Sequence, residues 1–238
     1  MWKKVRKVKD EITPIYLAEK LRPNVKTSWV DKPVSPKVPA TSHVDPMAVI
    51  IGDVTIGECV NIAPGAIIRA DEGMPIVIGD ESNIQDGVII HSLKGKGVTI
   101  GKRVSLAHRA IVHGPATIGD RTFIGFGSIV YRCNIGNNCV ILHNAVVTDS
   151  SIPNGKFLVS CSLVQDNSMV ESLPDVTEEL SDFASHVVEV NKELAKGNIL
   201  LEQKQIKRKN RGESEAINQS KKIKRRELWQ WVYENLKI

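Results

Sequence analysis

A hexapeptide repeat constrains this chain more than any other feature of its sequence. From Val54 onward, aliphatic residues recur every six positions, and glycine often follows them, as in Ile56-Gly57 and Ile100-Gly101. The repeated positions are Val54, Val60, Ala66, Ile78, Ile84 and Ile90; Ile56, Ile62 and Ile68; Ile100, Leu106, Val112, Ile118, Ile124 and Val130; and, after a one-residue deletion, Ile135, Ile141 and Val147. The strands of an ordinary sandwich do not hold such a period over so long a stretch.

The period has a physical cause in the parallel β-helix. Short strands joined by tight turns coil around an aliphatic interior, and each six-residue unit forms one side of a triangular prism. Glycine and asparagine accept the turn geometry between the sides. Three units make a coil of about 18 residues, and neighbouring coils stack at roughly the 4.8 Å separation of paired strands. We therefore expect an all-β solenoid at the centre of the chain.

The composition limits the kind of protein in which this solenoid can occur. The 238 residues are 42% hydrophobic and 25% charged, which predicts one soluble domain with appendages. Four cysteines form no CxxC pair, so we expect buried thiols and a reduced, cytoplasmic location. No stretch approaches the ~20 apolar residues of a transmembrane segment. Prolines scattered through residues 1–45 predict an extended N-terminal arm.

Three of the six histidines lie in one polar stretch of the repeat. Arg69, His91 and His113 follow one another at equal intervals, each equal to one coil plus a four-residue offset, so they should share a column on one face. Two imidazoles one coil apart can share a metal, because Zn–N bonds are about 2.0–2.1 Å long. His108 should face another side of the prism. A third ligand would then come from a neighbouring copy, which predicts a closed ring, most simply a trimer. The alternative is that these histidines are ordinary surface residues.

The motifs around these histidines closely resemble those of the gamma-class carbonic anhydrases. They are Arg-Ala-Asp-Glu-Gly-Met-Pro at 69–75, Asn-Ile-Gln-Asp-Gly at 83–87, His91, Ser-Leu-Ala-His at 105–108, and Gly-Pro after His113. The resemblance covers about residues 46–197, and hexapeptide acyltransferases in general share the repeat but not this set. It implies a left-handed parallel β-helix, a homotrimer, and Zn²⁺ between subunits, with Fe²⁺ or Co²⁺ as other choices. The implied reaction is the reversible hydration of CO₂ to bicarbonate.

The resemblance also implies roles for particular residues. His91 and His113 of one chain and His108 of the next would hold the metal, and Arg69 and Asp71 would form an intersubunit ion pair. The side chains that would hold solvent and bicarbonate are Gln85, Asn83, Glu72 and Asn191. Glu72 is the first candidate for accepting the proton that the hydration of CO₂ releases. The alternative is that Glu72 is only a solvated loop residue. Asn191 could equally be purely structural.

Two departures from the family leave the activity open. The loop after His91 is short and basic, with Lys94 where well-known members carry an acidic loop and a glutamate proton shuttle. Glu189 replaces an aromatic residue that the family often has two positions before the asparagine. A thioester hydrolase using the same metal site, and a non-catalytic assembly subunit, are therefore the alternatives.

The C-terminal third should be helical at its start. Thr177 can cap a helix that runs to about Leu201, and its apolar face would pack on the prism and bring Asn191 toward the metal cleft. We expect the β-helix domain at 46–173, this packing helix at 174–203, and a tail at 204–238.

The tail has a strongly basic composition. Residues 204–226 hold ten Lys or Arg against two Glu, which predicts a flexible linker or a solvated helix. The aromatic segment at its end would be amphipathic and dock on its own trimer or on another protein. A polyanionic partner, such as an anionic membrane surface, is a further candidate, because the basic run at 222–226 beside Trp229 and Trp231 suits polyanions, but we do not predict nucleic-acid binding.

Overall fold

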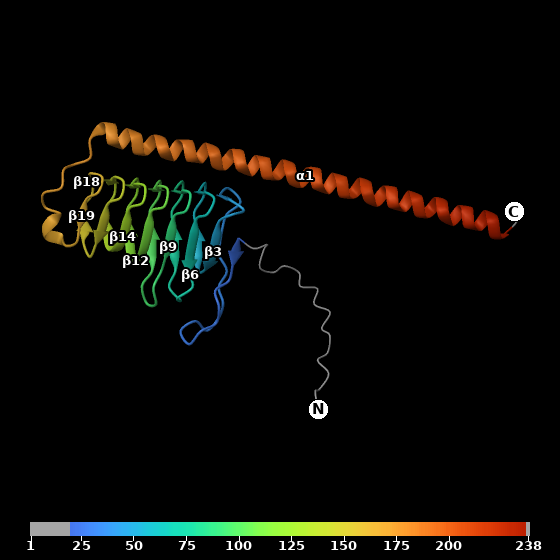
Figure 1. Cartoon of the computed structure of the whole chain (residues 1–238), viewed down its shortest axis with the longest axis horizontal. Helices are drawn as coiled ribbons and strands as arrows, with labels where there is room; N and C mark the ends of the chain where they lie inside the picture. Colours follow the sequence, from blue (N-terminus) through green and yellow to red (C-terminus); the bar gives the residue numbers. More distant parts are fainter. Residues whose placement is uncertain (1–19, 237–238) are drawn as a thin grey trace, which may run out of the picture. The chain divides into compact units, whose positions relative to one another are not determined.

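The chain folds as a parallel β-helix followed by a single long helix (Figure 1). The structure is a computed structural model that describes residues 20–236, with side chains described as far as residue 207. The strands pair in parallel with the strands one coil away, and seven such coils stack on one another. The predicted β-helix of hexapeptide repeats with a C-terminal helix is confirmed.

Three sides make up the prism. The histidine side contains β3 (Val49–Gly52), β6 (Ile67–Ala70), β9 (Ile89–His91), β12 (Ile111–Ile118), β14 (Ile129–Ile135), β16 (Val146–Thr148) and β19 (Leu163–Val164). The open side contains β4 (Val54–Ile56), β7 (Ile76–Ile78), β10 (Val98–Ile100), the second halves of β12 and β14, and β17 (Ser151–Ile152). The helix side contains β2 (His43–Val44), β5 (Asn61–Ile62), β8 (Asn83–Ile84), β11 (Ser105–Leu106), β13 (Phe123–Ile124), β15 (Val140–Ile141) and β18 (Phe157–Leu158).

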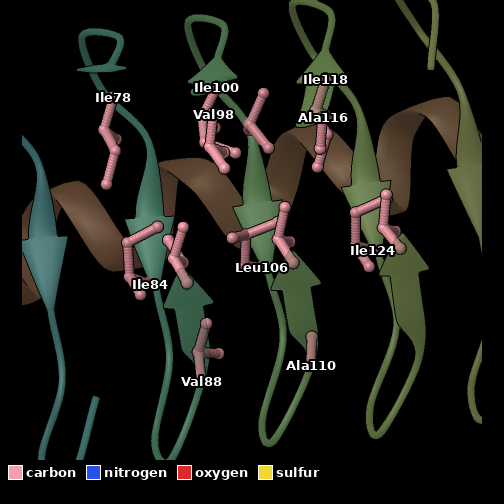
Figure 2. Packing of buried hydrophobic residues seen from close by; sticks show 14 of the residues in the cluster. Ile78, Ile84, Val88, Val98, Ile100, Leu106, Ala110, Ala116, Ile118 and Ile124 are labelled. Atoms are coloured by element: carbon pink, nitrogen blue, oxygen red, sulfur yellow. The ribbon is translucent and has the colours of Figure 1, made fainter. Parts of the chain in front are cut away.

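The core is a set of stacked aliphatic columns inside the prism. Each strand alternates inward and outward side chains, and the inward ones are those of the hexapeptide repeat. Ile84, Leu106 and Ile124 occupy the same position on successive coils and are fully buried, and Figure 2 shows them in a row from left to right, one on each coil. Ile78, Ile100 and Ile118 form a second such column. The repeat thus fixes which side of each strand is buried.

Loop excursions explain the irregularities of the repeat. On the open side, Val54, Ile76 and Val98 are register partners in succession, and Val98 in turn pairs with Ala116 after a shorter interval of sequence. The extra four residues in each of the two longer intervals lie in loops at 71–75 and 92–97, outside the stacked strands. The predicted four-residue offsets are therefore confirmed.

The N-terminal arm joins the β-helix earlier than the sequence indicated. β1 (Leu21–Arg22) pairs with β3, and β2 already belongs to the helix side, so the first coil includes His43 rather than beginning at residue 46. The part of the arm before residue 20 lies outside the described residues. No helix within the described range is long and apolar enough to cross a membrane.

The helix α1 (Glu178–Leu236) begins at the predicted cap. The Leu180 N–H donates to Thr177 Oγ1 over 3.3 Å. The helix continues through the basic tail instead of ending near Leu201. The chain forms two compact units, and the boundary between them falls between Lys196 and Gly197. The aromatic end of the tail lies beyond the described side chains, so its docking stays a prediction. A short 3₁₀ helix, η1 (Asn167–Met169), precedes α1.

The four cysteines are free, but only two of them are buried as expected. Cys133 and Cys139 lie in the core, and burial raises the pKa of both thiols. Cys161 is exposed and Cys59 is half-buried. The expectation was wrong for these two because both occupy turn positions with positive φ, 63° and 57°, where the side chain leaves the prism.

Candidate functional site

The register of the histidine side places Arg69, His91 and His113 in one outward-facing column. β6 pairs with β9 so that Arg69 lies beside His91, and β9 pairs with β12 so that His91 lies beside His113. This confirms the column predicted from the equal spacing of the three residues. The two imidazole rings meet edge to face, with centroids 4.9 Å apart, and His91 Nδ1 lies 3.1 Å from His113 Nε2.

The outer nitrogens of the two rings both face acceptors. His91 Nε2 lies 3.2 Å from Asp71 Oδ1, and His113 Nδ1 lies 3.4 Å from the Gly114 carbonyl oxygen. Because both acceptors favour a donor, we assign the ring proton of each imidazole to its outer nitrogen. The inner nitrogens of the neutral rings then face each other with lone pairs. Two tetrahedral ligands of a zinc ion have nitrogens roughly 3.3 Å apart, so the pair fits a divalent transition metal.

Asp71 connects His91 to Arg69. Arg69 Nε donates to Asp71 Oδ2 over 3.0 Å, while the other carboxylate oxygen faces His91. Burial by itself would raise the pKa of Asp71, but the hydrogen bond and charge of Arg69 outweigh it and hold that pKa below its usual value. The carboxylate is therefore charged at neutral pH. This ion pair lies within one chain, and pairing across subunits stays a prediction.

Glu72 lies at the edge of the same column. Its Oε1 is 3.7 Å from His91 Nε2, and its Oε2 accepts the Lys94 backbone N–H over 3.0 Å. Glu72 thus holds the loop at 92–97 against the histidine side. The Lys94 ammonium lies 5.0 Å from the ring centroid of Trp29, which comes from the N-terminal arm. The Glu72 carboxylate therefore lies beside His91, and the loop at 92–97 adds the positive charge of Lys94 near this edge of the histidine side.

His108 belongs to a different part of the prism. It lies in the turn after β11, at the corner between the helix side and the histidine side, with half of its side chain exposed. Its Nδ1 is 2.8 Å from Asp86 Oδ2, and its ring lies 5.1 Å from that of Phe126. Among the side chains described, residues 20–207, no three from His, Cys, Asp or Glu converge as a metal site in one chain.

The amide residues lie with His108 rather than with His91. Gln85 and Asn83 are buried beside one another, one coil before Ala107 and Ser105. Gln85 Nε2 donates to Asn83 Oδ1 over 2.9 Å, and Asn83 Nδ2 donates to Ser105 Oγ over 2.7 Å. Because Asn83 holds one amide N–H of Gln85, the remaining N–H and the carbonyl oxygen of Gln85 are left for other partners.

Asn191 reaches the helix side from α1. Its Oδ1 accepts from Asn61 Nδ2 over 3.1 Å, and its own Nδ2 donates to the Val187 carbonyl over 3.0 Å. Asn61 lies one coil before Asn83 in the same outward column. The structure therefore places Asn191 over the polar column that includes Asn83, and not beside His91.

An ion cluster fixes this part of α1 to the prism. Glu81 Oε2 accepts from Arg103 over 2.6 Å and from Lys192 over 2.8 Å, and Glu189 contacts the same two cations. Hydrogen bonds from Lys192 to Glu81, and from Arg103 to Glu189, lower the pKa of both carboxyl groups. Glu189, at the position where the family often has an aromatic residue, thus joins an ion cluster.

Two residues at this site escaped the sequence analysis. His43 and Asn61 are buried in the outward column of the helix side, next to Asn83 and Ser105. A signal for them existed, because polar–aliphatic pairs recur once per coil at His43-Val44, Asn61-Ile62, Asn83-Ile84 and Ser105-Leu106. The candidate residues thus form two half-sites. The histidine half-site contains Arg69, Asp71, Glu72, His91 and His113, and the amide half-site contains His108, Gln85, Asn83 and Asn191.

Comparison with known proteins yields relatives along most of the chain. Over 198 residues the chain is 40% identical to a carbonic anhydrase of Methanosarcina thermophila, covering 74% of this chain and 80% of that protein. It is also 40% identical over 181 residues to the carboxysome assembly protein CcmM of Nostoc sp., covering 72% of this chain but only 33% of CcmM. No protein-family model matches the chain.

Solved structures agree with the fold. A hexapeptide transferase family protein from Anaplasma phagocytophilum superposes with a TM-score of 0.62 and 28% identity, covering 74% of this chain and 96% of that one. A putative acetyltransferase from Bacillus cereus has the same TM-score at 22% identity, over 76% of this chain and 98% of that one, which shows the shared fold. The solved structures show the fold, and the 40% identity to the Methanosarcina enzyme over 80% of its length shows that the chain belongs to the gamma-class carbonic anhydrase family.

Proposed function

We propose that this protein hydrates CO₂ reversibly to bicarbonate at a metal site shared between the subunits of a homotrimer. His91 and His113 of one subunit and His108 of its neighbour would hold the metal, Zn²⁺ in the first instance and Fe²⁺ or Co²⁺ as alternatives. The observation that carries the proposal is the pair of inner imidazole nitrogens, His91 Nδ1 and His113 Nε2, which face each other 3.1 Å apart while their outer nitrogens face acceptors.

An apolar stripe supports the association of copies through the histidine side. Outward aliphatic side chains occupy one register position on all seven strands of this side: Val49, Ile67, Ile89, Ile111, Ile129, Val146 and Leu163. None of them is buried, and Ile89 and Leu163 are exposed. The matching column on the open side holds Thr55, Val77, Thr99, Thr117, Asn134 and Ser151. An apolar stripe confined to the side with the histidines is what a buried interface requires.

The two half-sites suit complementary parts of the reaction. A divalent cation held by these three imidazoles would supply hydroxide from water near neutral pH. Gln85, anchored on Asn83, would orient solvent and bicarbonate through its remaining amide N–H and carbonyl oxygen. Asn191 would add a further amide on the bicarbonate side. Glu72 would accept the excess proton at Oε1, because Oε2 is already engaged by the Lys94 N–H.

Stopped-flow CO₂ hydration is the test of this proposal. Protein purified without oxygen and loaded with Zn²⁺ or Fe²⁺ should be active, and His108→Ala should lose at least about 100-fold in activity together with bound metal. His143→Ala is the matched control, because His143 lies at the same corner further along the prism, stacked 4.2 Å from Phe126, and is not a proposed ligand. A metal-loaded trimer without hydration activity would contradict the proposal, and acyl-CoA turnover by that trimer would establish the thioester hydrolase instead.

A non-catalytic assembly role is the second candidate function. The 40% identity to the Nostoc carboxysome assembly protein favours it, and so does Lys94, which brings a cation to the edge of the histidine side where a proton acceptor would help. This role predicts a stable oligomer that binds a protein partner and hydrates CO₂ no faster than its His108→Ala variant.

A further inference from the structure

Tyr131 follows His113 in the outward column of the histidine side. β12 pairs with β14 so that His113 lies beside Tyr131, one coil further from His91. The function proposed above gives Tyr131 no role. We propose that the Tyr131 ring holds the His113 imidazole against His91 and so presets the distance between the two ligands, an inference that rests on the proposed function because both imidazoles are proposed to bind the metal.

The His113 ring lies between two other rings. Its centroid is 4.9 Å from that of His91 and 5.5 Å from that of Tyr131. The ring planes meet at 74° and 72°, so both contacts are edge to face, a favoured arrangement of ring pairs. The strand register puts His91 and Tyr131 on opposite sides of His113. A His113 ring that leaned away from His91 would therefore collide with Tyr131.

The metal-free pair needs such a support because its inner nitrogens repel each other. With the ring protons on the outer nitrogens, His91 Nδ1 and His113 Nε2 face each other over 3.1 Å with two lone pairs and no proton between them. A bound cation would relieve this repulsion. Before a cation binds, the surroundings of the two rings must hold them together, as the partners of a preorganised site do.

The two histidines differ in how their outer nitrogens are held. His91 Nε2 faces the charged carboxylate of Asp71 over 3.2 Å. His113 Nδ1 faces the neutral carbonyl oxygen of the adjacent Gly114 over 3.4 Å, which is long for a hydrogen bond from an N–H group. Tyr131 contacts His113 from the side away from His91. This ring contact thus gives His113 the support that Asp71 gives His91.

The aromatic ring of Tyr131, and not its hydroxyl group, supplies this support. The side chain is partly exposed, so the hydroxyl can stay in contact with water while the ring packs on His113. Phenylalanine should therefore serve equally well at this position, and an aliphatic residue should not. Because Tyr131 acts through His113, it is a positioning residue and neither a metal ligand nor a catalytic residue.

The metal affinity of the full-length protein tests the proposal. Tyr131→Leu removes the ring but keeps an apolar side chain, and Tyr131→Phe keeps the ring. We expect Tyr131→Leu to bind Zn²⁺ about 3–10-fold more weakly than the wild type in chelator competition, because one ring pair is lost. Tyr131→Phe should stay within about twofold of the wild type. Wild-type affinity of Tyr131→Leu, or an equal loss in Tyr131→Phe, would overturn the proposal.

Phe183→Leu is the matched control for the loss of a ring contact. Phe183 meets Phe123 edge to face, with centroids 5.2 Å apart and ring planes at 67°. This pair has the same geometry but includes no proposed ligand, so Phe183→Leu should bind Zn²⁺ as the wild type does. Light scattering should give the wild-type mass for all three variants. A loss of affinity in Phe183→Leu equal to that in Tyr131→Leu, or a smaller oligomer in Tyr131→Leu, would refute the positioning role.

A crystal structure of the metal-free protein separates this inference from the proposed function. His113 Nε2 should lie farther from His91 Nδ1 in Tyr131→Leu than in the wild type, and Tyr131→Phe should keep the wild-type distance. An unchanged His113 ring in Tyr131→Leu would show that Tyr131 does not hold it. Absence of CO₂ hydration in the metal-loaded wild type would defeat the proposed function, while the position of the His113 ring would still decide the role of Tyr131.

Discussion

At the scale of single residues, spacing along the chain predicted more than residue type did. The equal intervals placed Arg69, His91 and His113 in one column because register in a β-helix is additive from coil to coil. The partners of their side chains were not predictable. The direction in which the Asp71 carboxylate points depends on the loop at 71–75, whose conformation lies outside the repeat. The contacts of His43 and Asn61 were not predictable, because His43 meets Asn61 one coil away and Asn61 donates to Asn191, which lies 130 residues further along the chain.

Removing the Asp71 carboxylate should weaken the proposed metal site without removing a ligand. Asp71→Asn replaces the charged acceptor of His91 Nε2 by a neutral amide, so the ring loses the partner that fixes its tautomer and orientation. We expect metal affinity to fall about 10–100-fold, measured by chelator competition. Asp149→Asn is the matched control, because Asp149 also pairs with an arginine, Arg132, at 2.8 Å on another coil. Equal affinities of the two variants would argue against this role of Asp71.

At the scale of elements, the repeat predicted the strands and the cap predicted the start of α1. The length of α1 was not predictable from the same signals. Residues 204–226 offer no apolar period, yet Lys, Arg, Glu and Gln have high intrinsic helix propensity, which favours a continued helix even without a packing surface. The docking of residues 178–196 was predicted from apolar spacing, but the predicted face was partly wrong, because Val190 and Leu194 are exposed. The buried residues of this segment are Ala184, Val188 and Ala195. The polar part of the docking, the cluster of Glu81, Arg103, Glu189 and Lys192, joins positions far apart in the sequence and gives no local signal.

Acid should loosen α1 through this cluster. The pKa values of Glu81 and Glu189 lie below those of the unfolded chain, so their stabilising effect is complete above about pH 4.5 and is lost as the pH falls through the lowered values. Glu81→Gln should therefore lower the melting temperature by about 1–2 °C at pH 7, since the cluster is partly exposed, and by less at pH 3.5.

Hydrogen exchange of residues 180–192 gives the local measurement for the same variant. Exchange there should be faster in Glu81→Gln than in the wild type at pH 7. Asp80→Asn serves as control, because Asp80 lies in the same turn but pairs with Lys102 at 2.8 Å and accepts the Glu58 N–H, both of which belong to the prism. If Asp80→Asn accelerates hydrogen exchange in α1 as much as Glu81→Gln does, then the turn that contains both residues, and not the ion cluster, holds the helix.

At the scale of the whole molecule, the three sides of the prism differ from one another in what they present. The helix side is covered by α1, where Leu180, Ala184 and Val187 pack on Phe123 and Val140. The open side presents mainly threonine and asparagine, and the histidine side presents the apolar stripe. The sequence predicted a ring of copies from the position of His108 alone. The stripe was not predicted, because the hexapeptide period marks only the buried residue that directly follows each member of the stripe.

A charge placed in the stripe should dissociate the proposed trimer. Ile89→Lys would bury an unpaired ammonium at the interface, which costs several kcal/mol per site. Light scattering after gel filtration at micromolar concentration should show monomers, with metal content reduced in parallel. Val77→Lys is the control, because Val77 is exposed to a similar degree, 40% against 38% for Ile89, but lies on the open side. A trimeric Ile89→Lys variant would exclude the stripe as the interface.

The two loop excursions have a consequence for how such a protein can change. Because the strands return to register after the extra residues at 71–75 and 92–97, the length of these loops is independent of the coils that carry the histidines. Insertions or deletions there can alter the charge and the accessible surface beside the column of Arg69, His91 and His113 while the column itself is preserved. A scaffold of this kind can therefore vary two short surface segments while the strands that hold the column stay unchanged.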